Sequence, residues 1–321
     1  MRAAACIAGM LCVVATHASA ADAYPARPIR IIVPFPPASG TDVVARMIGT
    51  PLAQSLGQPV VVDNRAGANG TIACDLTAKA APDGYTLLFG NASTLSMAPG
   101  LYRNLPYDPL KSFAPITLVS ASANVLVVNP NVKATNPAAL IALAKAKPGQ
   151  LNYGSAGSGN STHLAAELFR MMAGVDFVHV PYKGTPPLLA DLLTGQLQLS
   201  FASLISTLPH VRQSRLRALG VTSLKRAPSL PDVPTIDESG LKGYEVSVWQ
   251  GFVAPAKTAD AVITKLNTQI RSIVLSAENR ERFAAQGLDA AVNEPAQFRD
   301  YIAADTAKWA KVIRHAGIQP E

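Results

Sequence analysis

Cysteine is scarce in this chain, which has three in 321 residues. Cys6 and Cys12 lie in an apolar N-terminal stretch that we expect to be removed, so Cys74 is the one thiol of the predicted mature protein. This excludes an internal disulfide, and the fold must be stabilised by its apolar core. The hydrophobic content of 49% is high enough for such a core.

Long hydrophobic runs are also missing beyond the N-terminus. The N-terminal run extends from Ala3 to Val14, shorter than the ~20 apolar residues of a membrane span. It follows the positive Arg2 and leads to Ala18-Ser19-Ala20, a small-x-small pattern typical of signal-peptidase sites. We therefore predict a signal peptide at residues 1–20, cleaved after Ala20, and a soluble exported protein.

Dense clusters of basic residues are absent as well. No run of four or more Lys or Arg occurs, and aromatic residues are not interleaved with basic ones. Both features argue against nucleic acid as a partner. The 28 Lys and Arg against 21 Asp and Glu give a diffuse net charge of +7, which suits attraction of small anions or simply a solvated surface.

Motifs of the common enzyme classes are also missing. Residues 154–159 do not match G-x-S-x-G, and the stretch from Gly157 has Thr162 where a dinucleotide fingerprint needs its last glycine. The mature histidines show no metal-ligand spacing: His163, His179, His210 and His315. We expect no catalytic residue, no metal and no cofactor, with a secreted α/β hydrolase as the less favoured alternative.

Apolar strands alternate with helical patterns along the chain. Ile29 to Val33 is a β-branched apolar run followed by a small-residue loop and a helical pattern, and runs at Pro59 to Asp63 and Tyr85 to Phe89 repeat the arrangement. A second unit with the same alternation extends from Pro137 to Val221. Short connections predict parallel α/β sheets, in which ligands bind beyond the carboxyl ends of the strands.

The length predicts two domains, because about 300 mature residues exceed one typical core. Two apolar runs, Ile116 to Val119 and Val125 to Val128, have only small residues between them. This suits a long strand that crosses from one domain to the other. After Leu216 to Val221 we expect the chain to return, which gives a first lobe of 21–121 and 223–321 and a second of 122–222.

Two Gly- and Ser-rich loops are candidates for binding an anion, Pro36 to Asp42 in the first lobe and Gly154 to His163 in the second. Each follows an apolar strand and opens a helix, whose unpaired N–H groups and positive dipole end attract negative charge. If the loops face each other, their N–H groups and hydroxyls could hold a carboxylate. The alternative is that each is only a tight turn with capping residues.

Several motifs spread along the whole mature chain resemble the Bug family, the extracytoplasmic solute receptors of tripartite tricarboxylate transporters. Among them are Val33-Pro34-Phe35-Pro36-Pro37, Leu56-Gly57-Gln58-Pro59, Ala81-Pro82-Asp83-Gly84-Tyr85, Leu151-Asn152-Tyr153-Gly154-Ser155 and Val178-His179-Val180-Pro181-Tyr182-Lys183-Gly184.

The resemblance implies a periplasmic-binding-protein type II fold, with two α/β lobes joined by two hinge crossings. The lobes would close over a small organic acid, and the protein would deliver it to the membrane subunits of a tripartite tricarboxylate-type transporter. It also implies a periplasmic protein with no enzymatic activity, which we expect to be a monomer. A receptor that serves signalling rather than uptake remains the alternative.

In this family the ligand carboxylate sits on main-chain groups and ordered waters between the lobes. Carried over to this sequence, the first-lobe contacts are Phe35, Ala38, Ser39, Gly40, Thr41 and Asp42, with Asn91, Ser93 and Thr94 at the mouth. The second-lobe contacts are Ser155, Gly157, Ser158, Ser161, Thr162, His163, Lys183, Ala202 and Ser203. A packing role for His163 and a solvated position for Lys183 are the more common alternatives.

Two departures from the family pattern bear on the ligand. Many relatives have two glycines where this chain has Ala38 and Ser39, which reduces backbone freedom but adds a hydroxyl. Many also carry an acidic residue after the phenylalanine that corresponds to Phe201, where it can receive an amino group. Here Ala202 takes that place, which predicts a ligand other than an amino acid, such as a dicarboxylate, tricarboxylate or aromatic acid.

Overall fold

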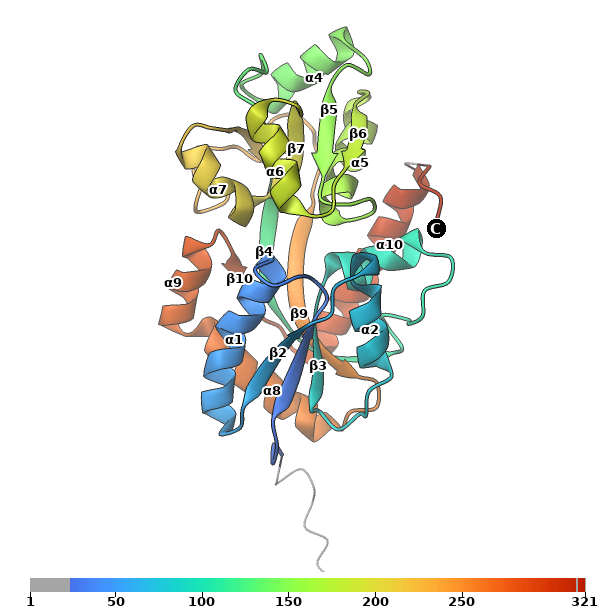
Figure 1. Ribbon diagram of the computed structural model, residues 1–321, viewed down its shortest axis with the longest axis vertical. Coiled ribbons are helices and arrows are strands. Elements are labelled where there is room, and N and C mark those ends of the chain that lie inside the picture. The colour runs from blue at the N-terminus through green and yellow to red at the C-terminus, as the bar shows by residue number, and fades with distance from the viewer. Residues whose placement is uncertain (1–23, 316, 321) are drawn as a thin grey trace, which may run out of the picture.

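The computed structural model describes residues 24–315 and 317–320. The predicted signal peptide, 1–20, lies outside the described residues. Figure 1 shows two α/β bodies connected by two long strands. We call the body that contains the N-terminal strands lobe 1 and the other one lobe 2.

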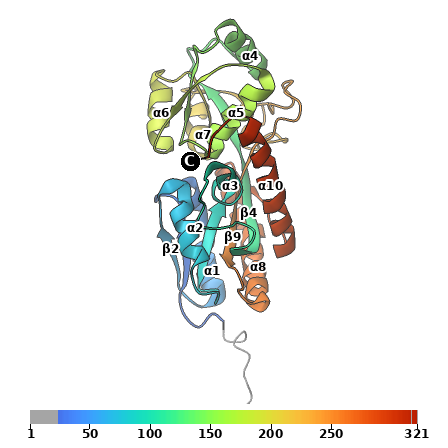
Figure 2. The ribbon, with the colours of Figure 1, turned by 90° about the vertical axis from the view of Figure 1, so that its right-hand side faces the viewer.

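Lobe 1 is built around a β-sheet with helices on both faces, and the short strand β10 pairs with β4 at its edge (Figures 1 and 2). The order of its main strands is β2-β1-β3-β9-β4, in which β1, β2 and β3 are parallel and β9 is antiparallel to both neighbours. Its elements are β1 (Ile29–Val33), α1 (Gly40–Leu56), β2 (Val60–Asn64), a 3-10 turn at Ala68–Gly70, α2 (Thr71–Ala78), β3 (Thr86–Asn91), a π-helical turn at Ser93–Met97, α3 (Ala98–Leu101), β9 (Ser247–Pro255), α8 (Asp260–Leu275), α9 (Ala277–Ala285), β10 (Asp289–Ala290) and α10 (Pro295–His315).

Lobe 2 repeats the pattern with a smaller sheet. Strands β7, β5 and β6 are parallel, and β7 and β8 pair with the far half of β4 in antiparallel fashion. Its elements are α4 (Pro137–Ala146), β5 (Asn152–Ser155), α5 (Ser161–Ala173), β6 (Val178–Pro181), α6 (Thr185–Thr194), β7 (Leu199–Ser203), α7 (Leu204–Arg212) and β8 (Arg217–Val221).

Strand β4 (Phe113–Val128) belongs to both sheets and is the crossing strand predicted from its two apolar runs. It pairs with β9 from Phe113 to Ala123 and with β7 from Asn124 to Val128. The register with β9 shifts twice, so the strand bends as it leaves lobe 1. The predicted α/β architecture with two crossings is confirmed, and β9 provides the second crossing.

The chain between β8 and β9 packs on lobe 2. The Val221 N–H donates to the Pro234 carbonyl oxygen at 2.9 Å, and the buried Tyr244 hydroxyl donates to the Ala165 carbonyl oxygen at 2.8 Å. Leu230 joins the apolar cluster of lobe 2. The predicted boundary after residue 222 stays a prediction, and these contacts favour a boundary near residue 246.

Helix α10 follows lobe 1 along one side and reaches α5 of lobe 2 (Figure 2). Its Phe298, Ile302, Trp309 and Ile313 recur at helical spacing and belong to the core. Its Asp305 accepts a hydrogen bond from the indole N–H of the buried Trp249 on β9 at 2.7 Å. The helix is thereby fixed against the second crossing strand.

Gly251 on β9 marks the tightest packing between that strand and α10. A Cβ atom at this position would clash with the Phe298 ring and lie 2.7 Å from the Thr117 carbonyl oxygen. We expect Gly251→Ala to reduce the free energy of unfolding by about 1–3 kcal/mol, because the core there has no room for one more methyl group. Urea unfolding followed by circular dichroism measures this.

A matched control is Gly49→Ala in α1. A Cβ atom there would make ordinary contacts, the nearest at 3.5 Å from Val60. Because alanine is the better helix former, this variant should be as stable as the parent or up to about 1 kcal/mol more stable. Equal stability of the two variants would contradict the tight packing at Gly251.

Candidate functional site

Helix α1 begins in the loop that follows β1, with Ser39 as its N-cap. The Ser39 hydroxyl accepts a hydrogen bond from the Asp42 N–H at 3.3 Å, and the Asp42 carboxylate accepts one from the Ala38 N–H at 2.9 Å. These two bonds hold the backbone of Ala38 at a positive φ of 63°. The N–H groups of Gly40 and Thr41 have no partner within residues 24–315 and 317–320, so they are free at the positive end of the helix dipole.

The Asp42 carboxylate ties this loop to β2. It accepts hydrogen bonds from Arg46 Nε at 3.0 Å and from Asn64 Nδ2 at 2.9 Å, and Asn64 Nδ2 also donates to the Phe35 carbonyl oxygen at 2.9 Å. Burial alone would raise the pKa of Asp42, but the hydrogen bonds from Arg46, Asn64 and Ala38 outweigh it and hold the pKa below its usual value. Asp42 is among the predicted ligand contacts, and its bonds favour a role in shaping the loop.

Helix α5 begins in the same way in lobe 2. Its N-cap is Asn160, whose Oδ1 accepts hydrogen bonds from the Thr162 N–H at 3.0 Å and from the Thr162 hydroxyl at 2.7 Å. The same hydroxyl accepts a bond from the Ala156 N–H at 2.9 Å. The N–H groups of Ser158 and Ser161 find no partner in the described part of the chain. Both loops therefore use their polar side chains internally and leave a few N–H groups free.

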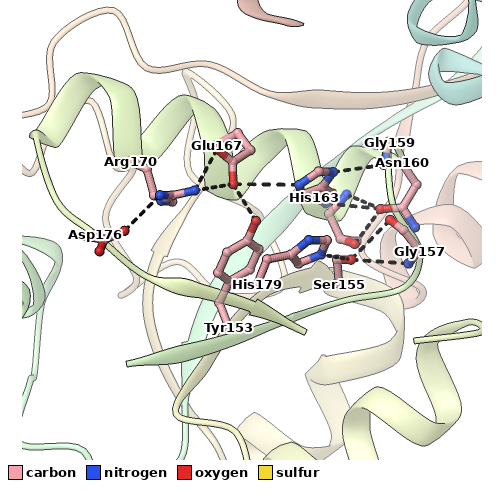
Figure 3. Close-up of polar contacts among 11 residues, drawn as sticks. Tyr153, Ser155, Gly157, Gly159, Asn160, His163, Glu167, Arg170, Asp176 and His179 are labelled. Atoms are coloured by element: carbon pink, nitrogen blue, oxygen red, sulfur yellow. Dashed lines mark hydrogen bonds and ion pairs between the residues drawn. The ribbon is translucent and has the colours of Figure 1, made fainter. Parts of the chain in front are cut away.

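A buried polar network lies behind the lobe 2 loop (Figure 3). The Ser155 hydroxyl is 2.7 Å from Nε2 of His179, and the His179 ring stacks on that of His163 with centroids 4.0 Å apart. His163 Nδ1 accepts a hydrogen bond from the Gly159 N–H at 2.9 Å. The two histidines thus hold the loop at Ser155, where β5 ends, and at Gly159.

The network ends in a set of ion pairs. The Tyr153 hydroxyl donates to Glu167 at 2.6 Å, and Arg170 bridges Glu167 at 2.8 Å and Asp176 at 2.9 Å. Burial, together with the Glu167 carboxylate, raises the pKa of Tyr153, so its hydroxyl stays protonated and remains the donor. Every charged group in this chain of contacts has an oppositely charged neighbour.

The contact between Ser155 and His179 resembles a nucleophile beside its base. Ser155, however, has no exposed surface, and its hydroxyl also donates to the Gly157 carbonyl oxygen at 3.1 Å. Within the described residues no carboxylate forms an ion pair with His179 that could orient its ring. The pair is therefore suited to fixing the loop rather than to attacking a substrate.

The two helix starts lie where the lobes meet. Asn69, in the 3-10 turn after β2, donates to the Ser158 carbonyl oxygen of lobe 2 at 3.0 Å. A Cβ atom placed on Gly40 would lie 3.7 Å from Cδ1 of Ile205 in α7. The loops of lobe 1 thus approach both the α5 loop and the start of α7 from across the junction.

The remaining predicted residues of lobe 1 form a closed turn at the end of β3. Asn91, Ser93 and Thr94 are all buried. The Asn91 N–H donates a hydrogen bond to Thr94 Oγ1, and the Thr94 N–H donates one to Asn91 Oδ1, both at 3.1 Å. A Cβ atom on Gly70 would lie 2.8 Å from Pro34 Cβ. The loops that follow the three parallel strands are therefore packed together.

The remaining predicted residues of lobe 2 differ in exposure. Lys183 is exposed, and Ser203 is partly buried directly before α7. Ala202 is 1% exposed and packs with Leu188 and Leu204 in an apolar cluster. This packing speaks against direct contact between Ala202 and a ligand.

Asn69 and His179 are positioned by the fold at this junction but are not among the predicted contacts. Asn69 has a local signal, because residues 64–70 form a small-residue loop like the two predicted ones. His179 has none: its contact with Ser155 depends on the parallel pairing of β5 with β6, in which Tyr153 faces His179.

In the described ranges, no group of three or more His, Cys, Asp and Glu residues is placed to hold a metal ion. No helix in the same ranges combines the length and the apolar character required to span a bilayer. Cys74 is buried, which raises the pKa of its thiol to about 12 and makes it unreactive.

Two surface hollows lie away from the junction. One, of about 340 Å³, is in lobe 2 beside Val132 and Leu197, and the other, of about 330 Å³, is in lobe 1 beside Tyr102 and Leu110. Neither is lined by a predicted binding residue or by one of the free N–H groups, so we do not assign the function to them.

Comparison with known proteins agrees with this geometry. The model of the tripartite tricarboxylate transporter family receptor matches residues 44–318. BugT of Bordetella pertussis is 42% identical over 298 residues, which cover 92% of this chain and 91% of BugT. The chain belongs to the tripartite tricarboxylate transporter receptor family. The resemblance to the Bug family is thereby confirmed, and the family is one of periplasmic solute-binding proteins.

Solved structures related to this receptor include proteins with bound acids. R. palustris Rpa4515 with adipate has a TM-score of 0.87 at 35% identity. The match covers 93% of this receptor and 100% of the Rpa4515 chain. MatC from Rhodopseudomonas palustris with bound malate has a TM-score of 0.82 at 30% identity. The match covers 90% of this receptor and 100% of the MatC chain. The periplasmic binding protein BugD has a TM-score of 0.83 at 35% identity, with coverages of 93% and 100%.

The stability of the receptor should depend on pH through His163. Burial, reinforced by the neighbouring His179, lowers the His163 pKa from 6.5 to about 4, although Glu167 acts in the opposite direction. Between pH 6.5 and 4 this histidine therefore binds a proton in the unfolded chain but not in the folded one. We expect the free energy of unfolding to fall by up to about 3 kcal/mol as the pH drops through this range. Urea unfolding at pH 7, 6, 5 and 4 measures this.

His163→Asn should show a smaller decline over the same pH range, since an amide cannot be protonated there and its oxygen can still accept the Gly159 N–H. The control His210→Asn removes a histidine on α7, outside the network, and should keep the decline. If His163→Asn retained the full pH dependence, the neutral His163 would not be its source.

Proposed function

We propose that this receptor captures a small organic carboxylate between its lobes in the periplasm and delivers it to the membrane subunits of a tripartite tricarboxylate-type transporter. The observation that carries the proposal is that one helix of each lobe begins at the junction of the lobes, with free N–H groups at Gly40 and Thr41 and at Ser158 and Ser161. Hydrogen bonds from backbone N–H groups to a charged acceptor contribute roughly 1.5–3 kcal/mol each. A carboxylate suits these free N–H groups because its oxygens only accept hydrogen bonds.

Two further observations support a carboxylate. The related structures with adipate and malate hold acids of this class. The receptor itself has an excess of positive charge, +7 over the full sequence, which favours the approach of anions. The preference for an acid without an amino group, expected from Ala202, stays a prediction, because the Ala202 side chain packs in the apolar cluster of lobe 2.

The proposed mechanism is lobe closure. A ligand that touches α1 of lobe 1 and α5 of lobe 2 makes all its contacts only when the lobes are together, so its binding energy favours the closed state. Asn69 adds to that state, because its bond to Ser158 joins the lobes. Ligand release to the membrane subunits would follow from opening.

No reaction is part of the proposal. The enclosed position of Ser155, and the use of its hydroxyl to hold the loop, disfavour the hydrolase alternative. A role in signalling uses the same closed state as uptake, and an uptake assay in a deletion strain distinguishes the two.

Gly40→Asp tests the seat at the start of α1. The added carboxylate would lie among the free N–H groups and repel a bound acid, so we expect affinity to fall by at least about tenfold, or 1.4 kcal/mol. Helix stability should not suffer, since a negative charge is favourable at a helix N-terminus. Isothermal calorimetry of ligand-stripped protein with a panel of small organic acids measures this.

The matched control is Thr50→Asp, which adds the same charge at an exposed position further along α1. It should leave affinity close to that of the parent. If Gly40→Asp bound acids as tightly as Thr50→Asp, the start of α1 would not be part of the site.

Asn69→Gly tests closure. Glycine keeps the positive φ of 50° at this position but removes the bond to Ser158. Losing one interlobe hydrogen bond should weaken acid binding roughly fivefold, about 1 kcal/mol. Tyr102→Phe is the control, because it removes the other hydrogen bond of Asn69, which lies within lobe 1. An equal loss of acid affinity in both variants would contradict a role for the interlobe bond.

A further inference from the structure

The two crossing strands, β4 and β9, carry buried polar atoms that are not part of the carboxylate site proposed at the starts of α1 and α5. Ser120 and Asn124 on β4 are 0% and 1% exposed, and Gln250 on β9 is 4% exposed. Ser120 Oγ, Gln250 Oε1 and both amide atoms of Asn124 have no hydrogen-bond partner among the described residues. Unpaired polar atoms in a protein interior are costly, so their concentration on the crossing strands calls for an explanation.

Gln250 lies in a row of polar residues across the lobe 1 sheet. In register it pairs with Asn91 of β3 on one side and with Ser120 of β4 on the other. Paired residues present their side chains on the same face of a sheet. The row is therefore a continuous polar strip over three strands, at the carboxyl end of β3.

This strip lies on the face of the sheet that α1 covers. Two residues before it, Phe89 pairs with Phe252, with ring centroids 4.6 Å apart, and both rings pack in one cluster with Val44 of α1. Side chains two positions apart on a strand share a face. Helix α1 follows β1 and begins at the same edge of the sheet, so the polar strip lies beside its start.

Asn124 occupies the equivalent place in lobe 2. It pairs with Ser203 of β7, and the next pair on that face, Leu126 and Phe201, packs in one cluster with Leu164 of α5. Asn124 therefore faces the side covered by α5. Since Ser120 and Asn124 are four residues apart on one strand, they project to the same side of β4, between the starts of α1 and α5.

We propose that Ser120, Asn124 and Gln250 form the floor of the ligand site and bind a hydroxyl group of the ligand, so that the receptor takes hydroxycarboxylates. This inference rests on the proposed function. The side-chain amides of Asn124 and Gln250 offer N–H donors and a carbonyl acceptor in either amide orientation. The Ser120 hydroxyl also both donates and accepts. A second carboxylate only accepts and an ammonium only donates. A hydroxyl both donates and accepts, and a plain methylene chain would leave these atoms unpaired.

The test compares matched acids that differ by one hydroxyl: malate with succinate, citrate with tricarballylate, and lactate with propionate. Isothermal calorimetry should find at least one pair in which the parent receptor binds the hydroxylated member about tenfold more tightly or better. In Gln250→Met and in Asn124→Leu this preference should shrink by about fivefold or more. Affinity for the acid without the hydroxyl should stay the same or rise.

The matched control is Ser122→Ala. Ser122 is on the same strand and is 6% exposed, but its hydroxyl already donates to the Val248 carbonyl oxygen at 3.3 Å. This variant should keep the preference. A second readout is the melting temperature of ligand-free Gln250→Met, which should equal or exceed that of the parent because a buried unpaired carbonyl is removed.

The outcomes separate this inference from the proposed function. If acids bind but the parent shows no hydroxyl preference, or if the variants weaken both members of a pair equally, the hydroxyl site is refuted and the carboxylate receptor stands. A marked loss of melting temperature in Gln250→Met would show a structural role and overturn the inference as well. If none of the six acids binds the parent but adipate does, the hydroxyl site is refuted and the carboxylate receptor stands; if no acid of the whole calorimetry panel binds, both proposals fail.

Discussion

The pairing of β4 with β9 is the interaction on which the rest of the structure depends. These strands provide the connection between lobes, and their ladder keeps the backbone hydrogen-bonded from Phe113 to Ala123 while the chain leaves one sheet and enters another. Because β4 continues into pairs with β7 and β8, the position of each sheet is set relative to the same strand. The loops at the carboxyl ends of the parallel strands are thereby brought to one junction.

At that junction the protein presents neutral N–H donors from the starts of α1 and α5. Capping explains how: Ser39 and Asn160 satisfy some of the N–H groups at the two helix starts, while Gly40 and Ser161 at the first helical positions keep theirs free. The Asp42 carboxylate at the lobe 1 loop is already engaged with Arg46. Free N–H groups carry partial positive charge, so the carboxylate that we propose as ligand would be held and released without breaking an ion pair.

The polar network that holds the α5 loop makes the stability of lobe 2 depend on pH. The histidines behind the loop stay neutral because burial opposes their charging, and Glu167 is matched by Arg170. A neutral His163 can accept the Gly159 N–H, whereas a protonated ring could not. The same network thus sets the loop geometry and makes the fold sensitive to acid.

Local pattern by itself determined the alternation of strands and helices, the crossing strand at Ile116 to Val128 and the two Gly- and Ser-rich loops, because strand burial and helix capping depend on neighbours in the chain. Tertiary structure alone decided that His179 supports Ser155, that residues 223–246 pack on lobe 2, and that Gln250 pairs with Asn91 of β3. Those relations join residues far apart in sequence, and only strand register and packing bring them together.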